Sequence, residues 1–257
     1  MPEPKSPKPK PSASKPARKS DLPLDARLSS TLIREIIANH YPPGAWLREQ
    51  EISARHGVSR ASVREALRNV AYAGFVDIQP WRGAQVAQIS KGDLLDIFSL
   101  LEQTYARCAA WAAERFPESA FVRLDEMMVQ VEDAVAKRSP NYDLDTLSFG
   151  IGQLVGRNSG SRLAYRMLVQ VGNLALWQQR ILLPGSDHTA QQSLCAHRVL
   201  VSAIKAREPE IAEAAARMIV MITRRSLAER DFGPAREAHN PPRPRRQQSD
   251  KRAVKGG

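Results

Sequence analysis

Cysteine, histidine and long apolar runs are all scarce in this sequence, and each scarcity excludes a class of protein. Two cysteines occur among 257 residues, Cys108 and Cys195, and they form no C-x-x-C pair, which excludes a disulfide scaffold and a cysteine-based zinc site. No run of about 18 apolar residues occurs, and the N-terminus lacks the apolar stretch of a signal peptide. We therefore expect a soluble, cytoplasmic protein with reduced thiols and no membrane partner.

Sequence motifs of several common enzyme classes are also missing. The chain contains no H-E-x-x-H, no G-x-S-x-G and no glycine-rich loop of the kind that cradles a phosphate. Of its five histidines, only His188 and His197 fall in the helical region after residue 90. A metal-dependent enzyme built in a helical bundle would need a further carboxylate–histidine pair. Such an enzyme is the least favoured alternative, and we expect no cofactor.

Positive charge, by contrast, is plentiful: 38 Lys and Arg stand against 27 Asp and Glu. The excess lies at the two ends, because residues 1–20 and 233–257 each carry a net charge of +5, whereas residues 21–232 contain 25 basic and 24 acidic side chains. Both ends are rich in proline and poor in large apolar side chains, so we predict two disordered tails. These tails would either bind phosphates non-specifically or serve as solvated extensions.

Residues 21–89 predict a small domain of three helices and a β-hairpin. Leu28, Leu32 and Ile36 recur at helical spacing, and the prolines before Gly44 end that first helix. A short helix over 49–55 leads to Gly57, and a third helix follows an N-cap at Ser59. Apolar alternation over 75–78 and 85–87, on either side of the turn at 80–83, predicts two strands.

Ordered motifs between Tyr41 and Val86 carry a resemblance to a known family. In chain order they are Pro43-Gly44, Leu47-x-Glu49-x-x-Ile52-Ser53, Gly57-Val58-Ser59-Arg60-x-x-Val63-Arg64-Glu65-Ala66-Leu67 and Gly83. The segment resembles the winged helix-turn-helix of the GntR family of transcription factors, many of which have proline where this chain has Ser62. The resemblance implies that the domain binds double-stranded DNA through its third helix.

The third helix has the two-sided character of a recognition helix. Arg60, Arg64 and Arg68 share one face, and an apolar stripe that includes Val63 and Leu67 lies opposite. Taken alone, the arginine face could be a solvated surface with Glu65 as a partner. The resemblance implies that Arg60 and Arg64 contact bases or phosphates. It also implies contacts from Ser59 and Ser62 to phosphates or base edges, from Gln50 near the groove edge, and from Arg82 with Gly83 in the wing.

Residues 90–232 predict an all-α bundle, so that the whole chain is mainly α. Helical stretches run over 92–116, 118–138, 142–157, 159–183, 187–207 and 208–231, which indicates six antiparallel helices. Trp111, Tyr165, Met167 and Trp177 are predicted to lie in its core. The region resembles the FCD domain of the FadR subfamily, with the helix number of the VanR-like branch. This resemblance implies an effector-binding and dimerisation domain.

Many FCD domains bind a divalent metal through one aspartate and three histidines, and the resemblance places these positions in this chain. They fall on Asp145, Phe149, His197 and Ile219, while Phe98 stands where the family tends to have an arginine four residues before a glutamate. With two apolar residues at ligand positions, we predict no bound metal. The pocket would take an apolar organic acid or an acyl-type effector, or would be filled without one, and His197 alone could be an ordinary interior histidine.

The leading hypothesis is a homodimeric, ligand-responsive DNA-binding repressor that recognises a palindromic operator. The second is a constitutive DNA-binding protein without an effector, which coats DNA with its basic tails.

Overall fold

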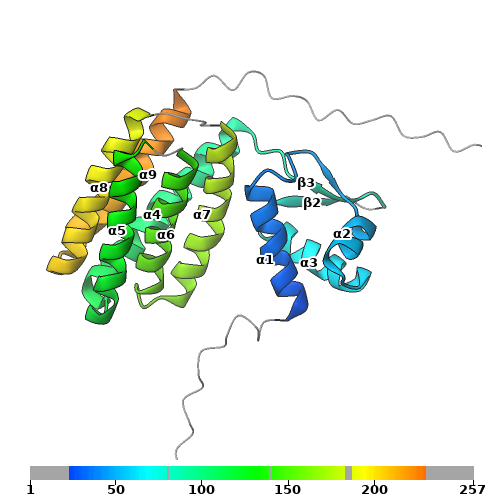
Figure 1. Cartoon of the computed structure of the whole chain (residues 1–257), viewed down its shortest axis with the longest axis horizontal. Helices are drawn as coiled ribbons and strands as arrows, with labels where there is room; N and C mark the ends of the chain where they lie inside the picture. The colour runs from blue at the N-terminus through cyan, green and yellow to red at the C-terminus, as the bar shows by residue number, and fades with distance from the viewer. Residues whose placement is uncertain (1–22, 80, 139–140, 183–186, 230–257) are drawn as a thin grey trace, which may run out of the picture.

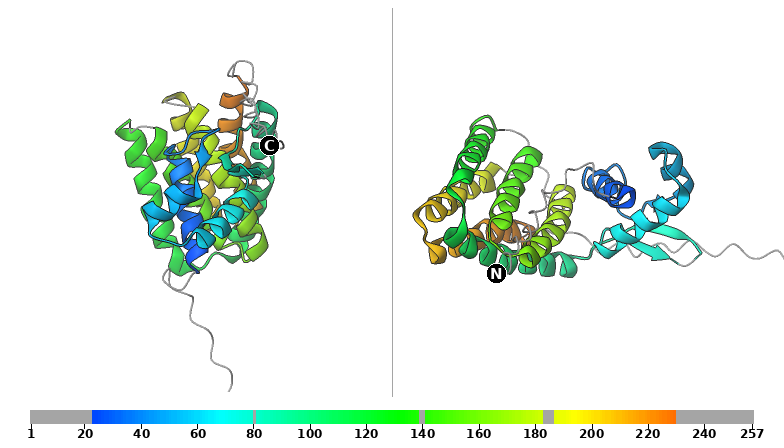
Figure 2. Two further views of the ribbon diagram at one scale, coloured as in Figure 1. Left: turned by 90° about the vertical axis from the view of Figure 1, so that its right-hand side faces the viewer. Right: turned by 90° about the horizontal axis from the view of Figure 1, so that it is seen from below.

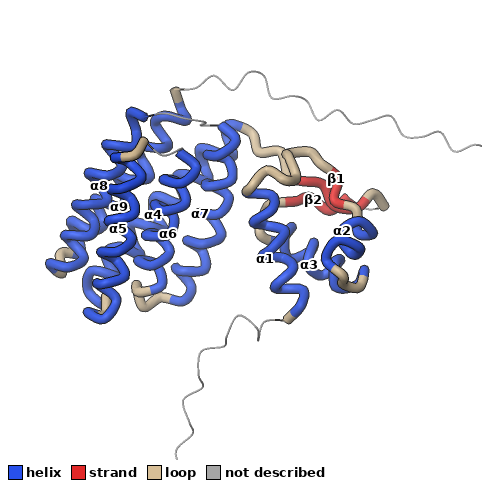
Figure 3. Tube along the Cα trace, viewed as in Figure 1, coloured by secondary structure: helices blue, strands red, loops and turns tan. Residues whose placement is uncertain are grey.

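The computed structural model describes residues 23–79, 81–138, 141–182 and 187–229, which form two groups of elements (Figure 1). The predicted tails, 1–20 and 233–257, lie outside the described residues. The N-terminal group contains α1 (Leu24–Ile37), β1 (Trp46–Leu47), α2 (Glu49–His56), α3 (Arg60–Tyr72), β2 (Val76–Gln79) and β3 (Gly83–Val86). The C-terminal group contains α4 (Lys91–Arg115), the 3₁₀ helix η2 (Glu118–Ala120), α5 (Phe121–Ala136), α6 (Asn141–Arg157), α7 (Arg162–Leu182), α8 (Asp187–Ala206) and α9 (Pro209–Ala228). Strands occur only in the first group among the described residues (Figure 3).

The N-terminal group has the three helices and the wing that the sequence predicts. The apolar stripe of α3 is buried together with the apolar side of α1, and these two helices pack against each other. α2 ends at Gly57, whose φ of +63° is the left-handed conformation that glycine adopts at little cost. α3 begins after Ser59, whose hydroxyl accepts a hydrogen bond from the backbone N–H of Ser62 at 3.1 Å. Local sequence signals therefore fix the entry into α3.

A three-stranded antiparallel sheet closes this domain, with the strand order β1-β3-β2. β2 and β3 form the predicted hairpin, in which Val76 lies opposite Val86. β1 pairs with β3 through Trp46 and Leu47. Two residues are too few to show an alternating apolar pattern, so the sequence does not predict β1.

The C-terminal group is the predicted six-helix bundle, counted over its described α-helices. α4 is the longest of these helices and packs against α6, α7, α8 and α9. Much of its buried side consists of alanines, and small side chains allow neighbouring helices to approach closely. Ser90 and Asp93 form a capping box at its start. None of the helices in the described part of the chain combines the length and hydropathy that a bilayer crossing requires.

α7 is a bundle helix that contacts the N-terminal domain. The ribbon views place it at the edge of the bundle beside α1 (Figures 1 and 2). Trp177 of α7 is fully buried, but it belongs to the apolar cluster of the N-terminal domain, where it meets Phe75. The prediction that Trp177 lies in the bundle core is therefore wrong. It is also wrong for Met167, whose side chain is 49% exposed. Helical spacing identifies an apolar face but not the element that covers it.

Candidate functional site

The polar face of α3 is exposed to solvent, while its opposite side is buried. Arg60, Arg64 and Arg68 are all exposed, and so is Ser59, whereas Ser62 is half-buried. Val63 and the other members of the apolar stripe have almost no solvent exposure. The structure thus brings the predicted arginines and serines together on one accessible surface of the domain.

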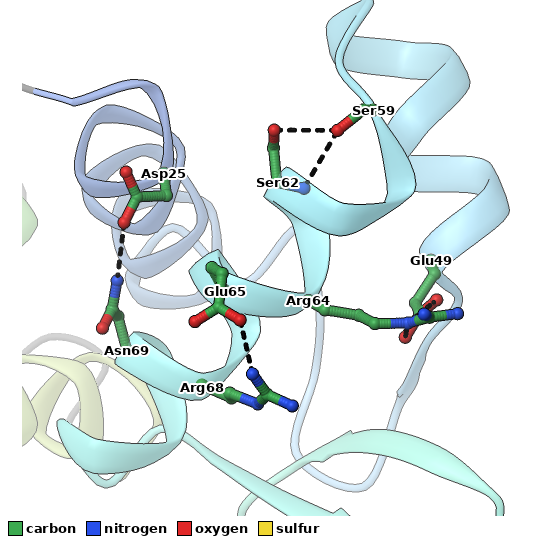
Figure 4. Close-up of polar contacts among 8 residues, drawn as sticks. All are labelled: Asp25, Glu49, Ser59, Ser62, Arg64, Glu65, Arg68 and Asn69. Atoms are coloured by element: carbon green, nitrogen blue, oxygen red, sulfur yellow. Dashed lines mark hydrogen bonds and ion pairs between the residues drawn. The ribbon is translucent and has the colours of Figure 1, made fainter.

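Arg64 is held by a glutamate from the neighbouring helix. Its Nε donates to both carboxylate oxygens of Glu49, at the start of α2, at 2.8 Å (Figure 4). This hydrogen bond, together with the charge of Glu49, raises the pKa of Arg64. Gln50, also predicted to contact DNA, follows Glu49 on α2 and is exposed. The glutamate therefore fixes the direction in which Arg64 leaves α3.

The other two arginines of this face differ in their partners. Glu65, the partner that a merely solvated surface would use, pairs with Arg68 one turn along α3 (Figure 4). Arg60 makes no hydrogen bond or ion pair with any residue that the structure describes. At the N-terminal end of α3, its guanidinium thus keeps its planar donors available for an external acceptor.

The wing ends in an exposed aromatic side chain. Trp81 lies between β2 and β3, is fully exposed, and has a φ of +64°, an unusual conformation for a bulky residue. Arg82 and Gly83, predicted to contact DNA, follow it and are also exposed. The sequence analysis does not single out Trp81. A large apolar side chain that is exposed at a hairpin tip contributes nothing to the core, so its position suggests a contact outside the domain.

A second candidate site is a cavity of about 100 Å³ inside the bundle, lined by α4, α6, α7, α8 and α9. Four of the five predicted pocket residues line it, namely Phe98, Asp145, Phe149 and Ile219. The fifth, His197, is fully buried and contacts Ser148, which lines the cavity. The structure thus gathers the predicted residues around one cavity, although they come from four different helices.

The residues at the predicted ligand positions do not fit a metal ion. Nδ1 of His197 lies 2.7 Å from the carbonyl oxygen of Ser193, which can only accept, so this nitrogen carries the proton. Nε2 then accepts from the hydroxyl of Ser148 at 3.0 Å, and burial lowers the pKa of His197, which favours the neutral ring. Both ring nitrogens are therefore engaged. The ring of Phe149 packs against the backbone of α7 at Gly172, where a Cβ atom would clash. No cluster of three or more His, Cys, Asp or Glu suited to a metal occurs among the described residues.

The cavity contains two polar groups with unusual surroundings. Asp145 accepts a hydrogen bond from Nε2 of Gln179, and burial raises the pKa of its carboxyl to about 7, against a smaller opposing effect of Arg180. Tyr105 is 5% exposed, and its hydroxyl has no hydrogen-bond partner among the described residues. Burial also raises the pKa of Tyr105, so the phenol is a neutral donor at pH 7.

One helix contributes to both the cavity and the N-terminal domain. Leu168, Gly172 and Gln179 of α7 line the cavity, and Trp177 packs into the N-terminal domain. Nε2 of Gln170 also donates to the backbone oxygen of Tyr72 at the end of α3, at 3.3 Å. A shift of α7 would therefore change contacts both in the cavity and in the N-terminal domain.

Comparison with known proteins decides the family. Residues 24–86 match the family described as bacterial regulatory proteins, gntR family, and residues 93–221 match the FCD domain. The chain belongs to the gntR family. Its FadR-like combination of a winged helix with an FCD domain is the one that the sequence motifs imply.

This GntR-family protein is similar in sequence to named repressors and in fold to a solved structure. It is 30% identical over 185 residues to the probable D-xylose utilization operon transcriptional repressor of Paenarthrobacter nicotinovorans, a match that covers 71% of this chain and 79% of the relative. It is 27% identical over 195 residues to the HTH-type transcriptional repressor RspR of Escherichia coli strain K12, covering 75% and 84%. The solved structure of E. coli McbR/YncC shares its fold, with a TM-score of 0.68 and 17% identity over 80% of this chain and 96% of that one. The two sequence relatives are named as repressors, and the GntR-family chain is accordingly a regulatory protein rather than an enzyme.

The sequence analysis does not predict two of the cavity residues of the GntR-family protein, Tyr105 and Gln179. Tyr105 lies seven residues after Phe98 on α4, and Gln179 lies seven residues after Gly172 on α7. A separation of seven places two side chains on the same helix face, two turns apart. Extending the predicted pocket by this spacing would include Tyr105, because Phe98 is one of the predicted pocket residues.

Proposed function

We propose that this chain is a transcriptional repressor whose α3 enters the major groove of an operator. The observation that carries the proposal is the division of α3, which buries its aliphatic side and exposes Arg60 and Arg64. Planar guanidinium groups bind guanine edges and phosphates, and a bidentate Arg–guanine pair contributes roughly 1–3 kcal/mol of discrimination. The relatives named as repressors support the direction of control.

The wing would read the minor groove beside the site of α3. Trp81 and Arg82 are exposed at its tip, and Gly83 has a φ of +103°, a backbone conformation that glycine adopts at little cost. Arginine and apolar side chains are both used by proteins that bind minor grooves. The wing would thus add contacts beside those of α3.

The repressor would act as a homodimer on a palindromic operator, in the cytoplasm where that DNA is found. One copy of α3 can read only a few base pairs, and a two-fold dimer pairs two such helices with two half-sites. The FCD domain would provide the dimer contact, as its family assignment implies.

The bundle cavity would hold an effector that controls DNA binding through α7. A ligand against Gly172 and Gln179 touches the helix whose Trp177 is buried in the winged helix. Such a ligand can change operator affinity only as far as it prefers one setting of α7 over another.

Enrichment of genomic DNA fragments tests the proposal even though the operator sequence is not known. The purified chain is expected to enrich a small set of fragments that share an inverted repeat. Arg60→Ala should lose this enrichment, while Arg123→Ala, at an exposed arginine of α5, should keep it. Equal enrichment by both variants, or fragments without a common sequence, would contradict the proposed function.

A further inference from the structure

We infer that the bundle cavity binds a compact amine, with an apolar body and a hydrogen-bond acceptor near the amino group, and not a carboxylate. The inference rests on the proposed function, in which this cavity holds the effector. It differs from the acid that the apolar pocket positions favour in the sequence, because it uses the charges and polar atoms that the fold brings together.

The charge of the cavity wall is the first argument. Among the described residues that line the cavity there is no Lys, Arg or His, and Asp145 is the acidic one. A buried ligand carboxylate would face this wall without a cation to pair with, which is unfavourable in a region of low dielectric constant. A ligand ammonium group would instead have Asp145 as its partner.

Three arginines directly adjoin lining residues in the sequence, and none of them lines the cavity; one of them, Arg225 beside Ser226, is exposed. Arg180 follows Gln179, but its Nη2 donates to the hydroxyl of Thr146 at 2.7 Å. Arg224 follows Thr223, but its Nη1 donates to Glu102 of α4 at 2.9 Å. Neither of these two guanidinium groups lines the cavity, and the charge of Arg180 acts on the carboxyl of Asp145 with a smaller effect on its pKa than burial has.

Asp145 has room for one more donor. Its Oδ1 accepts from Gln179, and its Oδ2 accepts no hydrogen bond from any residue within the described ranges. An ionised carboxylate can accept several hydrogen bonds. Burial raises the carboxyl pKa to about 7, and a ligand cation would offset that burial by stabilising the charged form.

Tyr105 supplies the second polar contact. Its hydroxyl is buried, neutral at pH 7 and without a partner among the described residues, and the side chain lines the cavity, with its ring packed beside Gly152. A buried hydroxyl that lacks a partner is unfavourable, so a ligand that brings an acceptor gains from meeting it. The pair Tyr105 and Asp145 therefore selects a ligand with an acceptor and an N–H group.

The size of the cavity limits the apolar body. Its volume of about 100 Å³ is of the order of a cavity that takes up a benzene-sized molecule. Phe98, Phe149 and Ile219 form apolar walls. A short branched or aromatic side group fits these walls, whereas a long acyl chain does not.

Matched pairs of probes test this inference on the full chain. Leucinol and 2-hydroxyisocaproate share one apolar body, and phenylalaninol and 3-phenyllactate share another, but only the first of each pair carries an amine. Thermal unfolding and calorimetric titration are expected to show binding of the amino alcohols and none of the hydroxy acids. Asp145→Asn should weaken this binding at least about tenfold and Tyr105→Phe about threefold, because one charge-assisted and one neutral hydrogen bond are lost.

The control is Asp96→Asn, at an exposed aspartate of α4, which should bind the amino alcohols like the wild type. Circular dichroism establishes that each variant is folded, and Tyr105→Phe keeps the test decisive if Asp145→Asn does not fold. Equal or stronger binding of the hydroxy acids, no binding of any probe, or amino-alcohol binding unchanged in both cavity variants would overturn the inference. Binding of the unliganded chain to its enriched fragments separates the two claims: if it persists while the probes fail, only the ligand class is wrong, and if it is missing, the proposed function is wrong.

Discussion

The ring of Phe75, which follows α3, lies against the indole of Trp177 in α7, with centroids 5.3 Å apart and a tilt of 37°. Both side chains are buried almost completely. This aromatic pair joins the core of the winged helix to the helix that lines the bundle cavity, and it gives the two domains a direct mechanical connection.

Replacing Trp177 by alanine should separate the unfolding of the two domains. The loss of a buried aromatic side chain costs about 3–5 kcal/mol, and here it falls on the contact between domains. Scanning calorimetry is expected to show one transition for the wild type and two for Trp177→Ala. Trp111→Ala, at a half-buried tryptophan of α4, should keep one transition. If both variants unfold in one transition, the domains do not depend on the pair Phe75 and Trp177.

Replacing Asp145 by asparagine should stabilise the protein at pH 8 and change little at pH 4. Burial raises the carboxyl pKa from 3.8 to about 7, so the folded chain keeps this proton at pH values where the unfolded chain has lost it. Stability therefore falls as the pH rises from about 4 to 7 and stays lowered above that range.

The expected gain for Asp145→Asn at pH 8 is about 1–3 kcal/mol, because the full linkage of roughly 1.4 kcal/mol per pH unit is reduced by partial exposure to solvent. Denaturant unfolding at both pH values measures it, with Asp96→Asn as the control. A variant that is less stable than the wild type at pH 8 would show that the carboxylate is paired in the folded chain rather than desolvated.

Divalent metals should not stabilise the protein. Phe149 and Ile219 occupy two of the four positions that the FCD resemblance assigns to ligands, and both ring nitrogens of His197 are engaged. Neither a chelator nor zinc is expected to change the melting temperature of the wild type by more than about 1 °C. The double variant Phe149→His with Ile219→His should gain a zinc-dependent increase. Zinc stabilisation of the wild type that Asp145→Asn removes would disprove the account of this site.

Removing the basic tails should lower the salt dependence of DNA binding and leave the operator preference. Residues 1–20 and 234–257 carry 13 Lys and Arg, whose contacts with phosphates would be independent of sequence. Titrations at several salt concentrations are expected to give a smaller slope and an unchanged ratio of operator to random DNA affinity. Loss of nearly all binding would instead favour the DNA-coating alternative.

The helix α3 and its arginine face could be predicted from the sequence because their signals are local. Ser59, Arg60 and the apolar stripe lie within four turns of one helix, where spacing determines which side chains share a face. The ion pair between Arg64 and Glu49 could not be predicted in the same way, because it depends on how α2 and α3 cross. Arg64 therefore has a fixed direction that its spacing alone does not show.

The cavity was predictable only in part, for a similar reason. The resemblance places Asp145, Phe149 and Ile219 at positions where many FCD domains have metal ligands, and the fold brings these three residues around one cavity. Helical spacing can place Tyr105 at the cavity, but whether its hydroxyl has a hydrogen-bond partner depends on every helix around it. No sequence pattern predicts that this hydroxyl lacks a partner. The position of Trp177 depends on the packing of α7 against a domain about 100 residues earlier in the chain, and spacing within α7 carries no information about that neighbour.

In the proposed repressor, the arginine face of α3 is the surface that reads DNA. Fluorescence anisotropy with one enriched fragment, at a fixed salt concentration, measures this most directly. Arg60→Ala and Arg64→Ala are expected to weaken operator binding by about 5- to 150-fold each, the range given by roughly 1–3 kcal/mol per arginine, while the fold and the binding by Arg123→Ala are unchanged. Operator affinity equal to that of the wild type in folded Arg60→Ala and Arg64→Ala would contradict the account.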